Sequence, residues 1–445
     1  MYPRTPLFRY GELLVLTGFL VTPAWSQQIS NRDRDRAEDM LQQISTDVRK
    51  HYYDPKFHGL DWDANVEKTK ERIDKADSLN KALSEVATAL GALNDSHTFF
   101  LPPARPFRHD YGWQTQMIGD RCYVTRVRPD SDAEAKGVKP GDEVLSVNGF
   151  VPSRDNLWKM EYVFNILRPQ GGLRVNLRDT AGSQRQVDVM ANIKQRKRVT
   201  DLTGEGGAQD IWDLIREGET AQNLTRARRT EMGDELMILK FPQFSFSESE
   251  VDAMIGAARK HKALILDLRG NPGGSVETLK YLVSGMFEEE VKIGDQVGRE
   301  KDMNKPMIAK VHGHNHFTGK LAVLVDSKSA SAAELFARVV QIEKRGAVLG
   351  DQTSGSVMES KRYSYKLGLD TVVFFGASIT VADLIMRDGK SLEHTGVSPD
   401  QIVLPAAADL ASGLDPVLAH AAETLGLKLS PEEAGKMFPY EWTKQ

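Results

Sequence analysis

The residues best suited to do chemistry include a serine in a turn of small residues. Ser331 lies in the segment SASAA, which follows the apolar run Leu321–Val325 and precedes apolar residues at helical spacing. A serine at such a strand-to-helix turn leaves its hydroxyl open, and the amides at a helix N-terminus favour a developing oxyanion. The pattern predicts a nucleophile. The alternative is a serine that only caps the helix.

A histidine and a pair of glycines are the next candidates. His97 follows a helical pattern that breaks at NDSHT, so it could act as a general base oriented by Ser96; the alternative is an ordinary hydrogen-bonded loop histidine. Gly273 and Gly274 close the segment RGNPGG between the strand 263–268 and the helix 276–287. Paired glycines there let backbone amides approach a ligand, and the alternative is a tight turn without one.

These residues must be positioned by several different regions of the chain. Residues 31–93 show apolar positions at helical spacing, with a loop at YDP and at GLDW, and predict a small helical region. From residue 234 onward, strands expected at 236–241, 263–268 and 321–325 alternate with helices. This alternation favours right-handed crossovers and a largely parallel sheet. The polar segment 194–233 between the regions is interpreted as a connection with marginal structure.

Residues 112–192 change to short strands with one or two helices. The strand 122–127, the helical turn 131–136 and the run AKGVKPGDEVLSVNG lead to a helix near 162–167 and the strand 173–177. This segment resembles a PDZ domain, which implies binding of extended peptide termini by strand addition. The carboxylate-binding loop is expected near Tyr111–Trp113. The alternative is a PDZ domain that serves only as a packing module.

Composition sets outer limits on the function. The 445 residues carry a net charge of −4 and no block of basic residues, so a nucleic-acid partner is not expected. The single cysteine, Cys122, excludes an intramolecular disulfide and a cysteine-based zinc site.

The first residues resemble a secretion signal. Arg4 and Arg9 flank the apolar run LLVLTGFLV, and the small-x-small sequence Ala24–Ser26 follows it. No apolar run is long enough to span a bilayer stably. We therefore expect cleavage near Ser26 and a periplasmic or secreted protein; an uncleaved membrane anchor is the alternative.

Four motifs occur in this order along the chain: LILDLRGNPGG, LAVLVDSKSASAAELFA, GAVLGDQTSGS and LEHTGVSPDQIV. Together with the PDZ-like segment they resemble the C-terminal processing (tail-specific) serine peptidases. The resemblance implies an α+β multidomain protein with an N-terminal helical region, a PDZ-like β domain and an α/β, crotonase-like ββα-type peptidase core. The expected boundaries are a signal peptide at 1–26, the helical region at 27–110, the PDZ domain at 111–195, the core at 196–430 and a tail at 431–445.

One departure from the family decides the expected mechanism. In the lysine-dependent branch the base lies 25 positions after the nucleophile, but this chain has Ser356 there. Lys361, the next lysine, would need a five-residue shift. The lysine-free branch, typified by the tricorn core protease, uses a Ser-His pair and a glutamate instead, and the matching residues here are Ser96, His97 and Glu393.

The resemblance thus implies an exported serine endopeptidase without a cofactor that cleaves extended polypeptides. Ser331 would be the nucleophile, His97 the base, Ser96 and Glu393 its supports, and the amides of Gly273, Gly274 and Ala332 the oxyanion hole. The alternatives are a catalytically weak PDZ-containing scaffold on a peptidase fold, or a core that binds a non-peptide ligand.

A metal site is a weaker interpretation of three histidines. His312, His314 and His316 alternate in HGHNH, so they could share one face of a strand and bind zinc. No nearby carboxylate completes a metal motif, and the family uses no metal. We expect activity to survive chelation.

Overall fold

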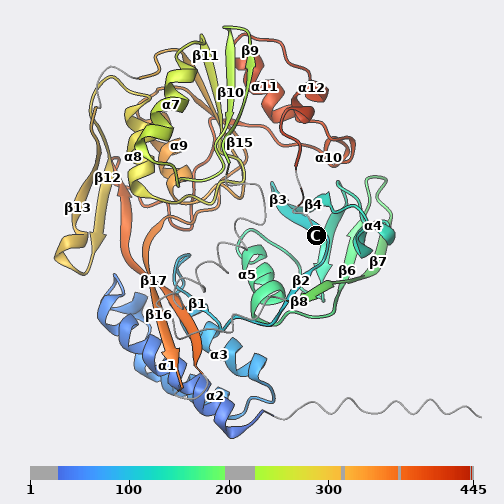
Figure 1. The fold of residues 1–445 in the computed structure, drawn as a ribbon, viewed down its shortest axis with the longest axis vertical. Coiled ribbons are helices and arrows are strands. Elements are labelled where there is room, and N and C mark those ends of the chain that lie inside the picture. Colours follow the sequence, from blue (N-terminus) through green and yellow to red (C-terminus); the bar gives the residue numbers. More distant parts are fainter. Residues whose placement is uncertain (1–28, 196–225, 312–315, 369–371, 441, 443–445) are drawn as a thin grey trace, which may run out of the picture.

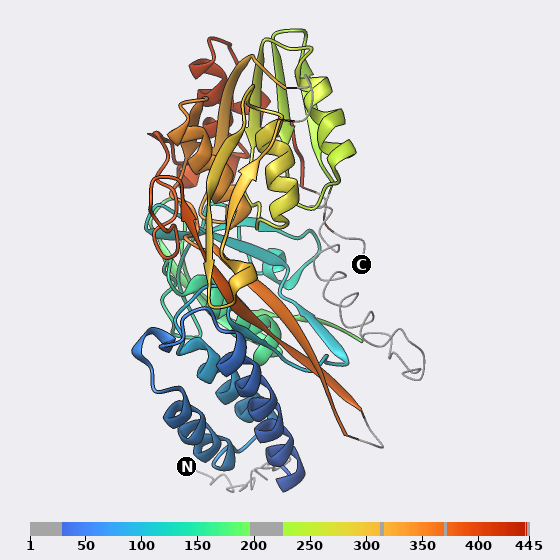
Figure 2. The same cartoon turned by 90° about the vertical axis from the view of Figure 1, so that its left-hand side faces the viewer.

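The computed structural model describes residues 29–195, 226–311, 316–368, 372–440 and 442. It has a helical region at one end, a PDZ-like domain in the middle and an α/β core at the other end (Figure 1). A long two-stranded hairpin runs from the core down to the helices (Figure 2).

The helical region consists of α1 (Asn31–His51), α2 (Trp62–Asp74) and α3 (Leu79–Gly91), with the short 3-10 helix η1 (Phe57–Gly59) between the first two. Each of the three helices begins at a side chain that accepts a hydrogen bond from the first turn: Ser30, Asp61 and Ser78. Their apolar faces pack together and against Phe375, Ala377 and Ile379 of the hairpin. The helical region thereby fixes the segment 94–98 that follows α3.

The hairpin belongs to a five-stranded antiparallel sheet that we did not predict from the sequence. Its strands are β1 (Phe99–Leu101), β17 (Val373–Met386), β12 (Val291–Gly298) and β13 (Lys305–Ala309) in that order, with β16 (Met358–Leu367) also paired to β17. The 3-10 helix η3 (Lys301–Met303) joins β12 to β13. Because β1 begins just after Thr98, its pairing with β17 ties the segment of the candidate base His97 to the core.

The PDZ-like domain is a five-stranded antiparallel sheet with three short helical elements. The strands are β3 (Trp113–Ile118), β4 (Arg121–Val127), β5 (Glu143–Val147), β6 (Gly172–Arg178) and β7 (Gln184–Met190). The helical elements are α4 (Asp132–Ala135), α5 (Leu157–Tyr162) and the π-helical turn η2 (Val163–Leu167). The strands β2 (Phe107–Asp110) and β8 (Asn192–Gln195) pair where the chain enters and leaves the domain.

The core sheet has the order β18-β15-β14-β11-β10-β9 and is parallel except for β9. Its strands are β9 (Arg228–Met232), β10 (Leu236–Lys240), β11 (Ala263–Asp267), β14 (Lys320–Val325), β15 (Ala347–Gly350) and β18 (Gln401–Ile402). The expected parallel sheet is confirmed. The expectation of marginal structure at 194–233 is wrong for β9, because the charged side chains of this edge strand make it resemble a polar loop in the sequence. Residues 196–225 lie outside the described residues.

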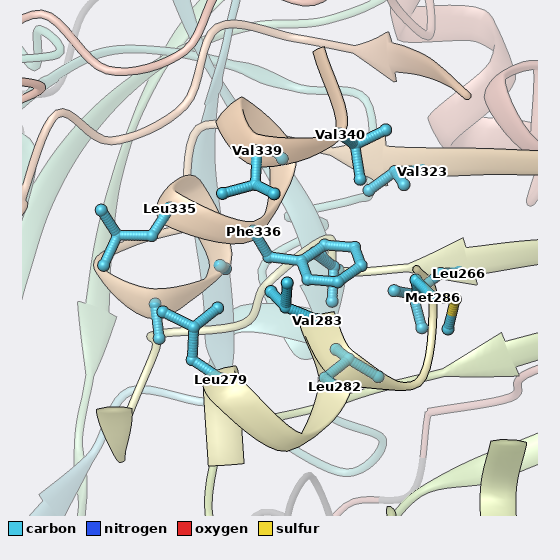
Figure 3. Packing of buried hydrophobic residues seen from close by; sticks show 14 of the residues in the cluster. Leu266, Leu279, Leu282, Val283, Met286, Val323, Leu335, Phe336, Val339 and Val340 are labelled. Atoms are coloured by element: carbon cyan, nitrogen blue, oxygen red, sulfur yellow. The ribbon is translucent and has the colours of Figure 1, made fainter. Parts of the chain in front are cut away.

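Helices cover both faces of this sheet. One face carries α7 (Glu248–Ala258), α8 (Val276–Ser284) and α9 (Ala332–Ile342), and Phe336 of α9 fills the space between α8 and the strands (Figure 3). The other face carries α11 (Pro416–Thr424) and α12 (Pro431–Lys436), preceded by α10 (Ala407–Ser412). Ala434 of α12 is buried, so part of the segment expected as a tail packs on the core. The carboxyl ends of β10, β11 and β14 face the PDZ-like domain, because their last residues, Lys240, Asp267 and Val325, line a cavity together with residues of β3.

Candidate active site

The strand β14 ends at Val325, and a five-residue loop leads to Ser331 at the start of α9. Ser331 has φ 54° and ψ −120°, a conformation that costs energy for any residue with a Cβ. Its N–H donates to the carbonyl of Ser356 at 2.9 Å and to Oε2 of Glu334 at 2.9 Å. These contacts hold the strained turn and leave the half-buried serine at the helix N-terminus.

The glycine loop lies directly against this turn. Gly273 has φ 90°, and a Cβ there would lie 2.6 Å from the Cβ of Ser331 and 3.0 Å from the nitrogen of Ala332. Gly274 has φ 142°, and its Cβ would lie 2.3 Å from the carbonyl oxygen of Phe244. Both positions require glycine. The amides of Gly274 and Ala332 have no hydrogen-bond acceptor among the described residues. Free amides of this kind are what an oxyanion hole needs.

Glu393, Ser96 and His97 form a continuous hydrogen-bonded chain. Ser96 Oγ donates to Glu393 Oε2 at 2.9 Å and lies 2.7 Å from His97 Nδ1. Because the single hydroxyl hydrogen of Ser96 points to the carboxylate, Ser96 Oγ accepts from Nδ1–H of His97. The imidazole then keeps an unprotonated Nε2, as a general base requires. Ser96 thus contacts the imidazole, and Glu393 lies behind Ser96.

Burial and nearby charge tune the two titratable members of this chain. Desolvation lowers the pKa of His97 from its ordinary value of 6.5, although the charge of Asp95 acts in the opposite direction. Desolvation raises the pKa of Glu393 against the three hydrogen bonds it accepts from Val357 N, Ser96 N and Ser96 Oγ. Since all three partners donate, the geometry is that of an ionised carboxylate.

Asp95 organises the loop that carries His97, and sequence reasoning missed it. Its Oδ1 accepts from the amides of His97 and Thr98 at 2.9 and 2.7 Å and from Thr380 Oγ1 at 2.6 Å. Tyr52 donates its hydroxyl hydrogen to Oδ2 at 2.9 Å. An aspartate commonly bonds the backbone two residues on in a turn, but its partners Tyr52, just after α1, and Thr380 of β17 are far away in the sequence.

A second buried carboxylate, Glu334, holds the loop where the family's lysine would lie. It accepts hydrogen bonds from Thr353 Oγ1 at 2.5 Å, from the amides of Gly355 and Ser356 at 2.8 and 3.0 Å, and from Ser331 N. Burial raises its pKa to about 7, against these four donors. Sequence reasoning missed this role; the only signal was a glutamate three residues after a candidate cap.

The segment at Ser356 links the nucleophile to the histidine. Its carbonyl accepts from Ser331 N–H, and the next amide, Val357 N–H, donates to Glu393 Oε2 at 2.8 Å. Among the described residues, no hydrogen bond joins His97 to Ser331; catalytic hydrogen bonds are often longer without substrate. Lys361 lies farther along, exposed on β16.

A cavity of about 1120 Å³ lies between the PDZ-like domain and the core. Its walls include β3, α5, the strand ends at Lys240, Asp267 and Asp326, and the last described residues of the chain. Tyr111 and Trp113, in the expected carboxylate-binding loop, line it too. Ser331 and His97 do not line the cavity, so a bound chain would have to extend from it to reach them.

The PDZ-like domain contacts two loops of the core, at Asp326 before Ser331 and at Asp351 before β16. Gln116 Nε2 donates to Asp326 Oδ2 at 2.7 Å, and the same carboxylate accepts from the amide of Gly270 at 2.8 Å through Oδ1. Arg154 donates twice to Asp351 at 2.7 Å. The PDZ-like domain therefore helps to fix the loop before Ser331 directly, and the glycine loop only through Asp326.

Two expectations involve residues outside the described ranges. The secretion signal at 1–26 lies outside them, as do His312 and His314; His316 lies 3.5 Å from Glu288 Oε1. Within the described residues, no helix combines the length and apolarity needed to cross a bilayer, and no cluster of metal-binding side chains occurs.

Three family models match successive parts of the chain. Residues 33–86 match the tricorn protease C1 domain, residues 107–177 the PDZ domain and residues 235–403 peptidase family S41. Ser331 and Glu393 lie inside the S41 match, and His97 lies between the C1 match and the PDZ match.

Relatives with known names agree with these matches. The tail-specific protease of Haemophilus influenzae is 24% identical over 330 residues, which are 69% of this chain and 43% of that protein. The carboxyl-terminal-processing protease of Picosynechococcus is 23% identical over 82% of this chain and 83% of that protein. The structure of mature CPAF complexed with lactacystin superposes with a TM-score of 0.64 at 16% identity, covering 89% of this chain and 97% of that one, and so shares its fold. The α/β core at residues 235–403 thus matches peptidase family S41, the segments before it match a PDZ domain and the tricorn C1 domain, and the relatives that the chain resembles are named as proteases.

Proposed function

We propose that this protein is an exported endopeptidase that cleaves extended polypeptides with Ser331 as nucleophile and His97 as base. The observation that carries the proposal is the hydrogen-bonded chain from Glu393 through Ser96 to His97, linked through Ser356 and Val357 to the strained turn of Ser331. It supplies a neutral imidazole where the family's other branch supplies a lysine.

The reaction begins when His97 Nε2 takes the proton of Ser331 as Oγ attacks a peptide carbonyl. The carbonyl oxygen becomes an oxyanion, which the amides of Gly274 and Ala332 bind; Gly273 allows the close approach. The new imidazolium is stabilised by Ser96 Oγ, which is itself polarised by the carboxylate of Glu393. His97 then protonates the leaving amine, and water repeats the cycle on the acyl-enzyme.

The PDZ domain is proposed to recruit peptide termini beside this site. Its strand β3 lies at an edge of the sheet, so an extended segment could pair with it. The shared cavity then leads the bound chain from the PDZ domain toward the core. Export rests on the charged and apolar pattern of the first 26 residues.

Covalent labelling tests the proposed nucleophile and base. A fluorophosphonate probe is applied to the wild type, Ser331→Ala, His97→Ala and Lys361→Ala. We expect labelling to disappear in the first two variants and to persist in the lysine variant. Labelling that survives His97→Ala but disappears in Lys361→Ala would overturn the assignment.

The same experiment separates an enzyme from a scaffold. A folded wild type that stays unlabelled, with and without a peptide ligand, would favour a PDZ-containing binding scaffold. Labelling that appears only with the peptide would indicate a site closed until the PDZ domain is occupied.

A further inference from the structure

The last described residues of the chain cross from the core to the PDZ domain and line the cavity between them. Phe438 packs on the core beside α12, whereas Tyr440 and Trp442 contact the PDZ domain. None of these residues belongs to the chemistry described above. The segment Phe438–Trp442 is called the aromatic segment below; residue 441 lies outside the described residues.

The PDZ domain contacts this segment with one face of its first two strands. Gln114 of β3 and Arg126 of β4 are register partners, so their side chains share a face. The guanidinium of Arg126 lies 4.4 Å from the ring centre of Tyr440, and Gln114 Nε2 donates to the Tyr440 hydroxyl at 2.7 Å. These contacts form a site for an aromatic side chain with a polar tip.

A second ring occupies the adjacent position. The guanidinium of Arg128 lies 4.4 Å from the ring centre of Trp442, while its NH2 nitrogen pairs with Asp110 at 3.0 Å. Tyr440 and Trp442 also meet edge to face, with ring centres 5.0 Å apart. Arg126 and Arg128, each with its guanidinium over one ring, therefore accept two aromatic side chains that are separated by one residue.

The core side of the segment is held by a different strand. Arg228 of β9 donates to the carbonyl of Pro439 at 2.8 Å, and its guanidinium lies 5.5 Å from the ring centre of Phe438. All of these arginines and aromatic residues line the cavity. The segment is thus bound at both ends across the space that a substrate would use.

We propose that Tyr440 and Trp442 act as an internal ligand of a peptide-binding site formed by Gln114, Arg126 and Arg128, and that an incoming polypeptide with closely spaced aromatic residues competes for it. Among the described residues, the contacts with Tyr440 and Trp442 are ring stacking and a hydrogen bond, which are individually weak and can be displaced. Tethering compensates, because a short link gives the segment an effective concentration on the order of millimolar.

Binding in trans tests this proposal directly. The probe is a fluorescein-labelled peptide with the sequence of residues 436–445, and binding is measured by fluorescence anisotropy in the Ser331→Ala background. The parent is compared with Tyr440→Ala/Trp442→Ala, in which the internal ligand is removed. We expect the double variant to bind the peptide about tenfold more tightly, given a tethered competitor at millimolar effective concentration.

Matched controls separate the site from general stickiness. Trp158→Ala removes an exposed indole elsewhere on the PDZ domain and should leave peptide binding as weak as in the parent. Arg126→Gln added to the double variant should abolish the gain, and a probe with alanine in place of its tyrosine and tryptophan should not bind. Equal affinity of the parent and the double variant, or affinity indifferent to Arg126→Gln, would overturn the proposal.

The consequence for catalysis rests on the proposed function, but the binding result does not, because the nucleophile is absent from every chain in the assay. If the wild type hydrolyses polypeptides, the double variant should have a lower KM for a substrate containing Tyr-x-Trp. An inactive wild type that still shows the predicted binding would contradict the proposed function alone.

Discussion

The position of one hydrogen atom, on Ser96, determines whether His97 can act as a base. Ser96 gives its hydroxyl hydrogen to Glu393, so His97 must carry its proton on Nδ1. The carboxylate sets this arrangement without touching the imidazole. We therefore propose that Ser96 and Glu393 are positioning residues, each acting through the tautomer of His97.

Glu393→Gln should reverse this arrangement. The new amide nitrogen would donate to Ser96 Oγ, whose hydrogen would then turn to His97 Nδ1 and leave the proton on Nε2. We expect kcat to fall about 10²- to 10⁴-fold with little change in KM. Nitrogen NMR of the imidazole should report the Nε2–H tautomer, and an unchanged tautomer would contradict the proton assignment.

The pH profile provides a second test at the residue scale. Burial lowers the pKa of His97 below 6.5, so the base stays neutral at a pH where a free imidazole would be half protonated. The acid limb of kcat/KM should therefore have its midpoint below pH 6.5. The same depressed pKa makes a stability contribution that is present above pH 6.5 and lost as the pH falls through the folded pKa. A midpoint above 7 would exclude a desolvated His97 as the base.

At the scale of elements, Glu334 joins α9 to the loop before β16. A glutamine there would point its NH₂ group at amides that also donate, leaving buried donors unpaired. Glu334→Gln should lower the free energy of unfolding by about 2–3 kcal/mol. Urea unfolding measures this loss. Glu343→Gln, at the C-terminal cap of α9, removes an ion pair with Arg387 and should cost about 1 kcal/mol or less. Equal losses in both variants would contradict the role of Glu334 in stabilising the loop before β16.

The sequence predicted the elements with strong local signals. The expected strand from 263 and the expected helix from 276 begin where β11 and α8 begin, and the turn at Ser331 lies at the start of α9. The hairpin β16–β17 was missed because β16 alternates exposed charged residues with half-buried ones, which resembles a polar loop. Its meaning comes from a partner strand and from helices at the other end of the chain.

The candidate site, like the fold, was predictable only where the sequence carries a local motif. Ser96, His97 and Glu393 could be found from motif order, and the structure brings these three into one hydrogen-bonded chain, although their catalytic roles stay predictions. Asp95 could not be found, because its partner Thr380 is far away in the sequence. Glu334 could not be found either, because it accepts from backbone amides such as that of Gly355, in another loop. The local signals, a turn aspartate and a glutamate after a candidate cap, do not reveal these partners.

At the scale of the whole molecule, the PDZ domain is attached to the core through the loops of the candidate site. Arg154→Met would remove the paired hydrogen bonds to Asp351 and the bonds to the carbonyls of Gly119 and Gln352. We expect amide hydrogen exchange in the segments 117–120 and 351–354 to speed up about tenfold or more, as local opening becomes easier. Arg174→Met, which breaks an exposed pair within the PDZ domain, should leave both segments unchanged. Protection that persists in Arg154→Met would show that the domain is held by other contacts.

The central claim is that a histidine replaces the family's lysine, and turnover tests it most directly. The measurement is kcat/KM on a fluorogenic unfolded polypeptide for the wild type, His97→Ala and Lys361→Ala, with the fold of each variant checked by circular dichroism. We predict a loss of about 10²- to 10⁴-fold for His97→Ala and a change within about twofold for the exposed lysine. Full activity in His97→Ala together with its loss in Lys361→Ala would contradict the account.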